Sequence, residues 1–416
     1  MDGEEVTIAG WVHEVRDIGK IIFLLIRDHT GIAQVTAKRN FVSDEIMTSL
    51  SLQKESVIMV KGKVKQNKES RRGFEIIPEK VTNLNPLSAP IPFEVTGKVP
   101  ADLDVRLDNR YIDLRRPEVS SIFNIESTVL CTFREMLLKE NFQEIRTPSI
   151  VEAATEGGAD LFSLSYFEQK AYLAQSPQLY KQLAVIGGMD RIFMIVPVFR
   201  AEKSNTIFHL NEITQMDVEI GFAGYEDAIE LLKKVAEKTI SDVADKNIDD
   251  LEILGTTLPK TSAVEATYSK VISKLNDNGI KIEFGEDLKR EHEEEACRLL
   301  GDLLIIKEYP TSVRAFYSMP NEKDPELCNS FDLIYKGLEI SSGAQRIHLP
   351  NLLISALKKK GLDPSSFDFY IDAFRKGAPP HAGWSIGLER FTMKLTGSKN
   401  IRECALFPRD RHRLKP

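Results

Sequence analysis

Near the end of the chain, glycines and charged residues follow one another in a spacing suited to binding a flat, anionic ligand. Residues 381–390 read His-Ala-Gly-Trp-Ser-Ile-Gly-Leu-Glu-Arg. Glycine has no Cβ, so a planar ligand can lie against the bare backbone, and the guanidinium of Arg390 is a planar cation beside it. The pattern predicts a short apolar strand that leads directly into a helix beginning near Glu389 and Arg390.

A second charged pattern lies far upstream. Arg200 and Glu202 follow Phe199 at alternate positions, and His209 comes shortly after. Residues two apart on a strand project from the same face, and an arginine fork can bridge two anionic oxygens at once. A lone arginine or histidine is more often part of a surface ion pair. The two patterns together favour a site for an anionic ligand.

Composition sets the broad class of the protein. At 416 residues and 47.0 kDa the chain is long for one domain, so we expect two. It is 42% hydrophobic and 28% charged, as in globular proteins, and no apolar run approaches the ~20 residues of a membrane span. The four scattered cysteines argue against a zinc or disulfide framework and for a reducing, cytoplasmic setting.

The first 84 residues have the alternation of short β-strands around one helix. Strands are expected at residues 6–12, 20–28, 31–37, 56–64 and 74–78, with a helix near 43–52. Five strands with a helix between the third and fourth suggest an OB-fold barrel; another small barrel is the main rival. This part carries 13 Lys and Arg against 12 Asp and Glu, whereas the rest of the chain carries 42 against 50. A cationic cluster in it suits phosphate contacts, although such clusters are usually only solvated: Lys61, Lys63, Lys65, Lys68, Arg71 and Arg72.

The remainder reads as a linker followed by a larger domain. Prolines concentrate in residues 85–118, and helices and strands alternate from 119 to 416. Amphipathic helices are expected at 118–141, 225–247 and 289–304, and a strand at 142–148. We therefore predict an α+β protein in which the second domain is an antiparallel sheet flanked by helices.

The two charged patterns resemble motifs 2 and 3 of the class II aminoacyl-tRNA synthetases. Further stretches extend the resemblance over essentially the whole chain, to the aspartyl-tRNA synthetases of the archaeal and eukaryotic type: residues 107–118, 154–162, 175–182, 338–348 and 407–414. The resemblance implies a cytoplasmic homodimer that joins L-aspartate to tRNA(Asp) through aspartyl-adenylate, using ATP and Mg²⁺. Motif 1, which Pro148 closes, would form the two-fold interface.

The same resemblance assigns roles at the ATP site. Arg200 would bind the α-phosphate and act in catalysis, Glu202 would accept from the adenine amino group, and His209 and Arg390 would meet the γ-phosphate. Hard oxygen ligands suit Mg²⁺, and those implied here are Asp332, Glu339 and Ser342. The alternative is that the two carboxylates merely pair with nearby cations.

Lys181 and Arg346 match the positions that grip the aspartate side chain in this family. A buried carboxylate needs such partners, and asparaginyl enzymes usually lack the lysine. Gln178, Asp217 and Glu156 would orient the α-ammonium group, with Ser342 also at the amino acid. Asp217 has an acidic neighbour two residues away, Glu219, that competes for its assignment.

The barrel would read the anticodon by stacking and by contacts to base edges. The resemblance points to Phe23 as the stacking platform, with Arg16, Gln34 and Glu55 as polar contacts, although an aromatic on a strand is more often part of the core. His13 stands where relatives strict for aspartate tRNA often carry tryptophan. Histidine there resembles members that also charge tRNA(Asn), which we state as a hypothesis.

Two departures from the family pattern and three rivals remain. Ser385 replaces the first glycine of motif 3, and Ile213 stands where many relatives place a phenylalanine over the adenine. One rival is an asparaginyl-tRNA synthetase, against which Lys181 speaks. A second is a paralogue that binds nucleic acid without charging it. A third activates an amino acid for a small acceptor, but such paralogues generally lack the anticodon-binding barrel.

Overall fold

The computed structural model describes the chain apart from residues 1, 71–72, 153–160 and 204. Its contacts divide it into two compact units, Met1–Val105 and Arg106–Pro416, each described here by itself. Residues 86–102, within the predicted linker, contain no helix or strand and belong to the first unit.

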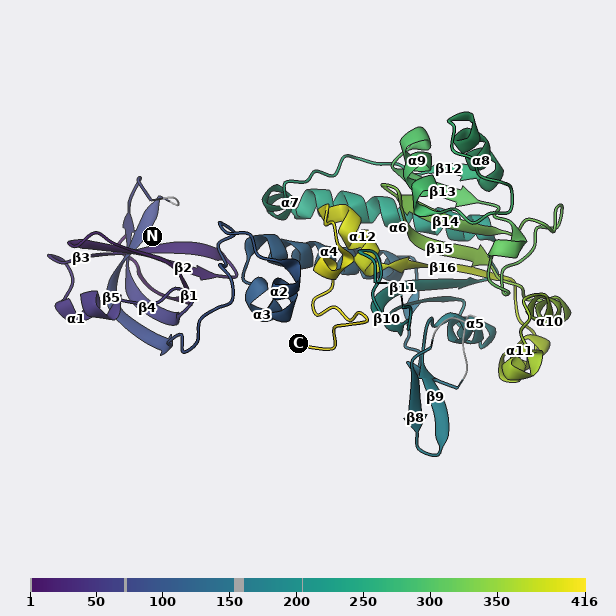
Figure 1. The fold of residues 1–416 in the computed structure, drawn as a ribbon, viewed down its shortest axis with the longest axis horizontal. Helices are drawn as coiled ribbons and strands as arrows, with labels where there is room; N and C mark the ends of the chain where they lie inside the picture. Colours follow the sequence, from purple (N-terminus) through teal and green to yellow (C-terminus); the bar gives the residue numbers. More distant parts are fainter. Residues whose placement is uncertain (1, 71–72, 153–160, 204) are drawn as a thin grey trace. The chain divides into compact units, whose positions relative to one another are not determined.

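The first unit is a closed five-stranded barrel, as predicted (Figure 1). Its strands are β1 (Glu5–Asp17), β2 (Ile21–Asp28), β3 (Gly31–Lys38), β4 (Val57–Gln66) and β5 (Phe74–Asn85), paired in the order β1-β2-β3-β5-β4. Helix α1 (Asp44–Ser49) lies between β3 and β4, and the Ser43 hydroxyl caps it by accepting from the Ile46 amide. Alternation decides what is buried: Ile22 and Leu24 fill the barrel, while Phe23 between them is outside its core cluster.

The second unit is built on an eight-stranded sheet. Its strands are β6 (Gln143–Glu144), β10 (Arg191–Phe199), β11 (Glu212–Gly221), β12 (Val264–Thr267), β13 (Leu303–Lys307), β14 (Ser330–Tyr335), β15 (Leu338–Gln345) and β16 (His381–Gly387). They pair in the order β12-β13-β14-β15-β16-β11-β10-β6. The central pairings are antiparallel as predicted, but the prediction is wrong at both edges, where β12–β13 and β10–β6 are parallel.

Helices cover one face of this sheet (Figure 1). They are α4 (Pro117–Lys139), α6 (Tyr225–Lys246) and α12 (Leu388–Thr396). Apolar residues of α4 recur three or four apart, at Ile125, Val129 and Phe133, and so form one buried stripe. Phe133 packs edge-on against Trp384 of β16. This face is the main hydrophobic core, whereas the opposite face is apolar toward the edges of the sheet, as at Met194 and Ile306, and carries polar side chains at its centre.

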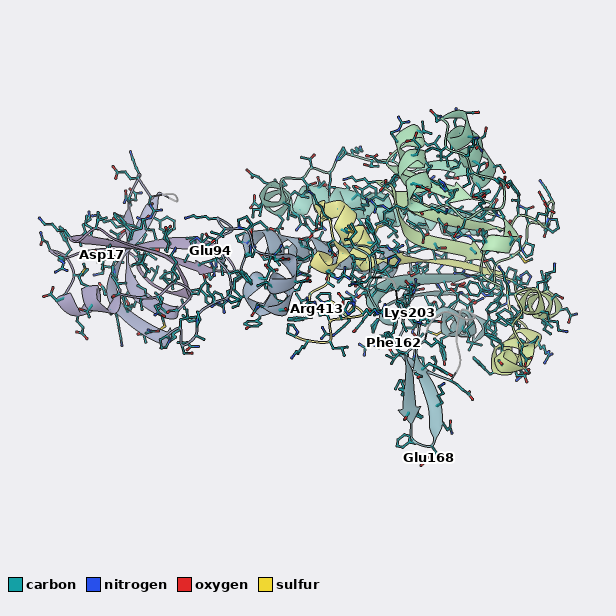
Figure 2. The ribbon with its side chains drawn as sticks, in the orientation of Figure 1. Asp17, Glu94, Phe162, Glu168, Lys203 and Arg413 are labelled. Atoms are coloured by element: carbon teal, nitrogen blue, oxygen red, sulfur yellow. The ribbon has the colours of Figure 1, made fainter. Side chains whose placement is uncertain are left out.

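Further helices and strands complete the second unit. They are helices α2 (Leu103–Asp108, which begins in the first unit), α3 (Arg110–Asp113), α5 (Gln178–Ile186), α7 (Ile248–Leu254), α8 (Tyr268–Asp277), α9 (Arg290–Leu300), α10 (Pro350–Lys359) and α11 (Asp368–Arg375), and strands β7 (Ile150–Val151), β8 (Ser163–Tyr166) and β9 (Gln169–Leu173). Figure 2 shows Glu168 at the tip of the β8–β9 hairpin. Among the described residues, no helix has the length and apolarity needed to cross a membrane.

Two predicted elements are shorter than expected. The helix predicted at 289–304 ends at Leu300. Gly301 adopts a φ of 138°, which lies outside the helical region of backbone conformation and favours glycine. The apolar residues after it form β13 instead. The strand predicted at 142–148 pairs only over Gln143–Glu144.

Candidate active site

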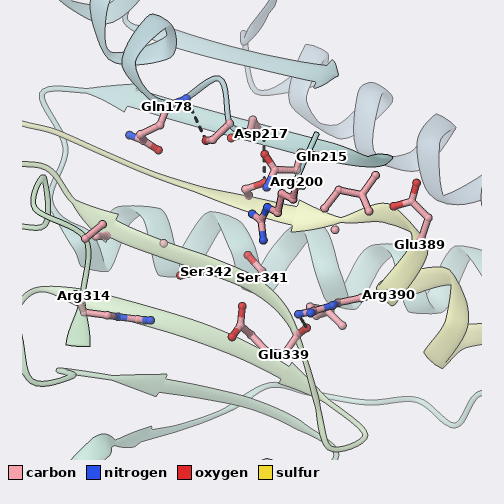
Figure 3. Close-up of a pocket in the computed structure, with 18 of the residues that line it drawn as sticks. Gln178, Arg200, Gln215, Asp217, Arg314, Glu339, Ser341, Ser342, Glu389 and Arg390 are labelled. Atoms are coloured by element: carbon pink, nitrogen blue, oxygen red, sulfur yellow. Dashed lines mark hydrogen bonds between the residues drawn. The ribbon is translucent and has the colours of Figure 1, made fainter. Parts of the chain in front are cut away.

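The polar face of the large sheet carries a cavity of about 460 Å³ (Figure 3). On β11, Gln215 and Asp217 face the cavity, while Met216 and Val218, which alternate with them, belong to the hydrophobic core. The sheet thus places its polar residues by simple alternation. Ten predicted residues line this cavity: Gln178, Lys181, Arg200, Glu202, His209, Asp217, Glu339, Ser342, Arg346 and Arg390. Glu156 lies outside the described residues.

Arg200 does not lie on the predicted strand. β10 ends at Phe199, and Arg200 and Glu202 belong to the irregular segment that follows. The segment is nevertheless fixed, because Asn211 accepts from the Arg200 amide at 2.9 Å and its side-chain amide donates to the carbonyl oxygens of Arg200 (2.7 Å) and Glu202 (3.1 Å). Arg200 therefore reaches into the cavity from a pinned loop.

Arg390 enters the same space from the first turn of α12, as the strand-to-helix pattern predicts. Its Nη1 donates to the Glu339 carbonyl oxygen at 3.3 Å. Arg200, Arg390 and the Glu339 side chain point toward a common space (Figure 3). Two acceptors in the wall, Gln215 Oε1 and Ser341 Oγ, are buried without a hydrogen-bond partner among the described residues. Buried polar atoms are usually paired, so this wall is suited to a polar ligand.

His209 lies at the mouth of the cavity with its neighbours defined. Its Nδ1 is 2.5 Å from Thr206 Oγ1 and its Nε2 is 3.9 Å from Glu202. Burial lowers the pKa of His209, so the ring is mostly neutral at neutral pH. Phe208, which sequence reasoning missed, also lines the cavity, with the Arg290 guanidinium 3.8 Å from its ring centroid. The only signal in the sequence is its position beside His209.

Of the three predicted metal ligands, two face the cavity. Glu339 and Ser342 line it, whereas Asp332 is buried and accepts from Arg314 at 2.5 Å. Burial and the charge of Asp332 raise the pKa of Glu339 to about 7. Arg314, which does line the cavity, was not predicted because it lies in an irregular segment without a motif. Among the described residues, no three Asp, Glu, His or Cys side chains converge as a metal cluster.

At the other end of the cavity, two cations and two carboxylates form a buried cluster. Lys181 Nζ is 2.8 Å from Asp217 Oδ1 and 3.3 Å from Glu219 Oε2. Arg346 donates to both oxygens of Glu219, at 2.9 and 3.2 Å. Although burial alone would raise it, the pKa of Glu219 is lowered by these two cations. The cluster is balanced in charge, as buried charges must be.

Asp217 lines the cavity, and its carboxylate accepts from Lys181 and from the Ser385 hydroxyl. It therefore helps to hold Lys181 in place, and its predicted contact with an α-ammonium group stays a prediction. Gly383 differs from the expectation, because its backbone is covered by protein rather than left for a ligand. A Cβ there would lie 2.2 Å from Glu219 Oε2, so glycine is required for this carboxylate to fit.

On the barrel, three predicted residues share one outer face. Arg16 pairs across the strands with Phe23, and Gln34 lies on the next strand. Arg16 is exposed and contacts Glu14 at 3.2 Å, while Phe23 and Gln34 are half-buried. Of the predicted cationic cluster, Lys61 and Lys63 form surface pairs with Glu5 and Glu79, and Arg71 and Arg72 lie outside the described residues.

His13 sits at a β-bulge, where the β1–β2 register shifts between Val12 and Glu14. A bulge redirects a side chain, and here the Arg27 guanidinium contacts His13 Nδ1 at 3.0 Å. Because a guanidinium only donates, Nδ1 must accept and the ring proton lies on Nε2. Burial and Arg27 lower the pKa of His13, which keeps the ring neutral.

Glu55 is not placed to read a base edge. It is buried, and both of its oxygens accept from Arg27, at 3.0 and 2.8 Å. Glu75, which sequence reasoning missed, lies beside Gln34 and accepts from Thr36 at 2.6 Å and from Asn67 at 3.0 Å. Glu75 is therefore a carboxylate beside the predicted reading face. Its only signal is an acidic residue within an apolar strand.

Comparison with known proteins agrees with this geometry. Residues 6–84 match the OB-fold nucleic acid binding domain family, and residues 102–411 match the class II tRNA synthetases (D, K and N). The chain therefore belongs to the class II tRNA synthetase family.

Comparison with individual relatives shows which members of that family this chain resembles. An aspartate–tRNA(Asp/Asn) ligase of Methanocaldococcus jannaschii is 49% identical over 100% of this chain and 96% of its own. The asparaginyl-tRNA synthetase of Pyrococcus horikoshii, solved with asparaginyl-adenylate, superimposes with a TM-score of 0.93 at 32% identity, covering 100% of this chain and 97% of that one. An Entamoeba histolytica aspartyl-tRNA synthetase gives 0.90 at 32% identity, over 100% and 90%. The fold is thus shared by enzymes for both amino acids, and the residues in the cavity must distinguish them.

Proposed function

We propose that this protein is an ATP-dependent aspartate–tRNA ligase. The observation that carries the proposal is the pair Lys181 and Arg346, two cations at one end of a cavity whose other end holds Arg200 and Arg390. The full-length likeness to archaeal aspartate–tRNA(Asp/Asn) ligases supports it. One end of the cavity suits a dicarboxylic amino acid and the other a triphosphate.

In the first step, an α-carboxylate oxygen of aspartate attacks the α-phosphorus of ATP and pyrophosphate leaves. Two anions must approach, so the protein has to position and neutralise them. Arg200 does so at the α-phosphate, and Arg390 and His209 bind the γ-phosphate. In the second step the 3′-hydroxyl of the terminal adenosine of tRNA attacks the adenylate carbonyl and AMP leaves.

Mg²⁺ fits the carboxylate side of this cavity. Glu339 and Ser342 offer hard oxygen atoms there, and a cation beside Glu339 would favour the ionised form of a carboxyl group whose pKa is raised by burial and by Asp332. These two residues would hold the ion, while Asp332 balances the charge of Arg314. When bound, the ion would neutralise phosphate oxygens.

Aspartate is favoured over asparagine by the charge it brings. Lys181 and Arg346 are already balanced by Asp217 and Glu219, yet all their nitrogens are donors. A substrate carboxylate would share these two cations with Asp217 and Glu219, whereas the NH₂ of an amide substrate cannot accept from either cation. A buried donor that faces another donor is costly, so discrimination by such a mismatch reaches large factors.

The test is ATP–pyrophosphate exchange with L-aspartate and L-asparagine. We expect exchange with aspartate only, and a rise of KM for aspartate on the order of 100-fold in Lys181→Met, because a buried cation contact is lost. Lys170→Met, at an exposed strand residue, is the control. Exchange with asparagine alone would identify an asparaginyl enzyme. No exchange with any amino acid would favour the paralogue that binds nucleic acid without charging it. Exchange in an enzyme that does not charge tRNA would favour the paralogue that uses a small acceptor.

The barrel binds the anticodon through the face that carries Phe23, Gln34 and Glu75, with Arg16 as a phosphate or base contact. His13 allows this face to accept both tRNAs. The anticodons of tRNA(Asp) and tRNA(Asn) differ only at the third base, C or U. An Nε2–H donor can meet the O2 oxygen that both pyrimidines carry. The names of the archaeal relatives, tRNA(Asp/Asn) ligases, support charging of both.

Aminoacylation of the two tRNAs side by side tests this breadth. We expect the wild type to charge both with aspartate, and His13→Trp to favour tRNA(Asp), since tryptophan at this position is typical of strict relatives. A wild type that charges only tRNA(Asp) would refute the His13 hypothesis without touching the amino-acid site.

The enzyme works as a cytoplasmic homodimer. The motif 1 resemblance around Pro148 supports the dimer, and the exposed apolar side chains of Leu138 and Ile150 flank this region. The free thiol of exposed Cys131 suits a reducing compartment. Sedimentation equilibrium should give twice the 47.0 kDa mass of the chain; a monomer at micromolar concentration would refute the dimer.

A further inference from the structure

Ser385 lies in the middle of β16 and faces the cavity. Its neighbours on the strand, Trp384 and Ile386, point into the hydrophobic core. Across the sheet Ser385 pairs with Asp217 on one side and with Ser342 on the other. The serine hydroxyl is therefore at the centre of the polar face, between the cluster around Lys181 and the carboxylate side of the cavity.

The Ser385 hydroxyl and Lys181 each bind a different oxygen of the Asp217 carboxylate. Ser385 Oγ donates to Asp217 Oδ2 at 3.1 Å, while Lys181 Nζ donates to Oδ1 at 2.8 Å. A carboxylate held by one hydrogen bond can turn about its terminal torsion, which is broad. With both oxygens engaged, the plane of this fully buried carboxylate is fixed. The position of the ammonium group of Lys181 is then fixed as well.

We propose that Ser385 is a positioning residue for the amino-acid substrate, acting through Asp217 to hold Lys181 at the substrate carboxylate. This inference rests on the proposed function, in which Lys181 binds that carboxylate. Glycine, which the family pattern places here, would leave Asp217 Oδ2 without this donor. The chain thus carries an additional hydrogen bond that acts on amino-acid affinity and not on ATP.

The experiment compares Ser385→Ala and Ser385→Gly with wild type in ATP–pyrophosphate exchange, and titrates L-aspartate calorimetrically. Both variants lack the hydroxyl, and alanine keeps the Cβ. We expect KM and Kd for aspartate to rise on the order of tenfold, as for loss of a hydrogen bond to a charged group. The KM for ATP and kcat should change less than about twofold. Ser355→Ala, on the exposed side of α10, is the matched control.

A second background shows whether Ser385 acts through Asp217. In Asp217→Asn, the Ser385→Ala change should have little further effect, because coupled residues are non-additive. An unchanged aspartate affinity in Ser385→Ala, equal changes for ATP and aspartate, or a full effect that persists in Asp217→Asn would each overturn the inference. An aspartate KM unaffected by Lys181→Met would instead overturn the proposed function beneath it.

Discussion

The two units use charge in different ways. Around the cavity of the second unit, Lys181, Arg346, Asp217 and Glu219 are buried and paired with one another. On the predicted reading face of the barrel, Phe23 and Gln34 are half-exposed and neutral, and the cation Arg16 is exposed to solvent. A small amino acid that differs from its rival by one charge requires desolvated cations, which are costly unless paired beforehand. An anticodon offers flat bases and many edge groups, which stacking and hydrogen bonds on an exposed face can recognise.

The largest effect should follow from breaking the buried cluster. Arg346→Met removes one of the two cations that contact Glu219. Lys181 then remains to balance two buried carboxylates, Asp217 and Glu219. We expect the free energy of unfolding to fall by about 3–5 kcal/mol, because an uncompensated charge stays buried. Urea unfolding measures it. Arg134→Met removes an exposed pair with Glu144 and should cost less than about 1 kcal/mol. Equal losses for the two variants would contradict the distinction between buried and exposed charge.

Removing Arg200, the cation that we propose for catalysis, should lower the reaction rate strongly and leave the stability of the fold nearly unchanged. Arg200→Ala should lower kcat of pyrophosphate exchange by roughly 10²–10³-fold, as for other transition-state donors. Because Arg200 is on a loop and only partly buried, the unfolding midpoint should stay close to wild type. Arg191→Ala, an exposed arginine at the start of β10, serves as control. Wild-type exchange in Arg200→Ala would remove this residue from the mechanism.

The barrel should respond differently. Phe23→Ala should weaken tRNA binding by about 1–3 kcal/mol, the usual value of one base stacked on an aromatic ring, and leave pyrophosphate exchange unchanged. Filter binding and exchange measure the two properties. Phe41→Ala, whose ring is 79% exposed in the same unit, provides the comparison. If Phe23→Ala and Phe41→Ala weaken tRNA binding alike, Phe23 is not the platform.

The pH-dependent effect concerns a carboxyl group outside the paired cluster. Burial and the nearby Glu389 raise the pKa of Glu126 from 4.5 to about 8. Between these values the folded state holds the proton more tightly than the unfolded chain, so stability should fall as pH rises from about 4.5 to about 8. Glu126→Gln should flatten this part of the dependence. Thermal unfolding between pH 5 and 8.5 at constant protein concentration tests it; an identical slope in the variant would exclude Glu126 as its source.

Motif and alternation were enough to locate most of the site, but not to assign each contact. The strand-to-helix pattern at Glu389 and Arg390 is a local feature and was predicted correctly. Arg200 proved to follow its strand, and no local pattern indicated that Asp217 contacts Lys181 and Ser385. Arg314 was missed because it lies in an irregular segment without a motif, and Glu75 because its partners Gln34 and Thr36 are distant in sequence.

By itself, the sequence determined the barrel, the helix-covered sheet and which charged residues share the catalytic unit, because periodicity and motifs are local properties of the chain. Only the tertiary structure decided which charges pair. The bulge that turns His13 toward Arg27 arises from pairing between strands, and the ladder that sets Ser385 between Asp217 and Ser342 joins strands far apart in the chain. Hydrogen bonds and ion pairs act over a few ångströms in space, and that distance is set by the register of the sheet.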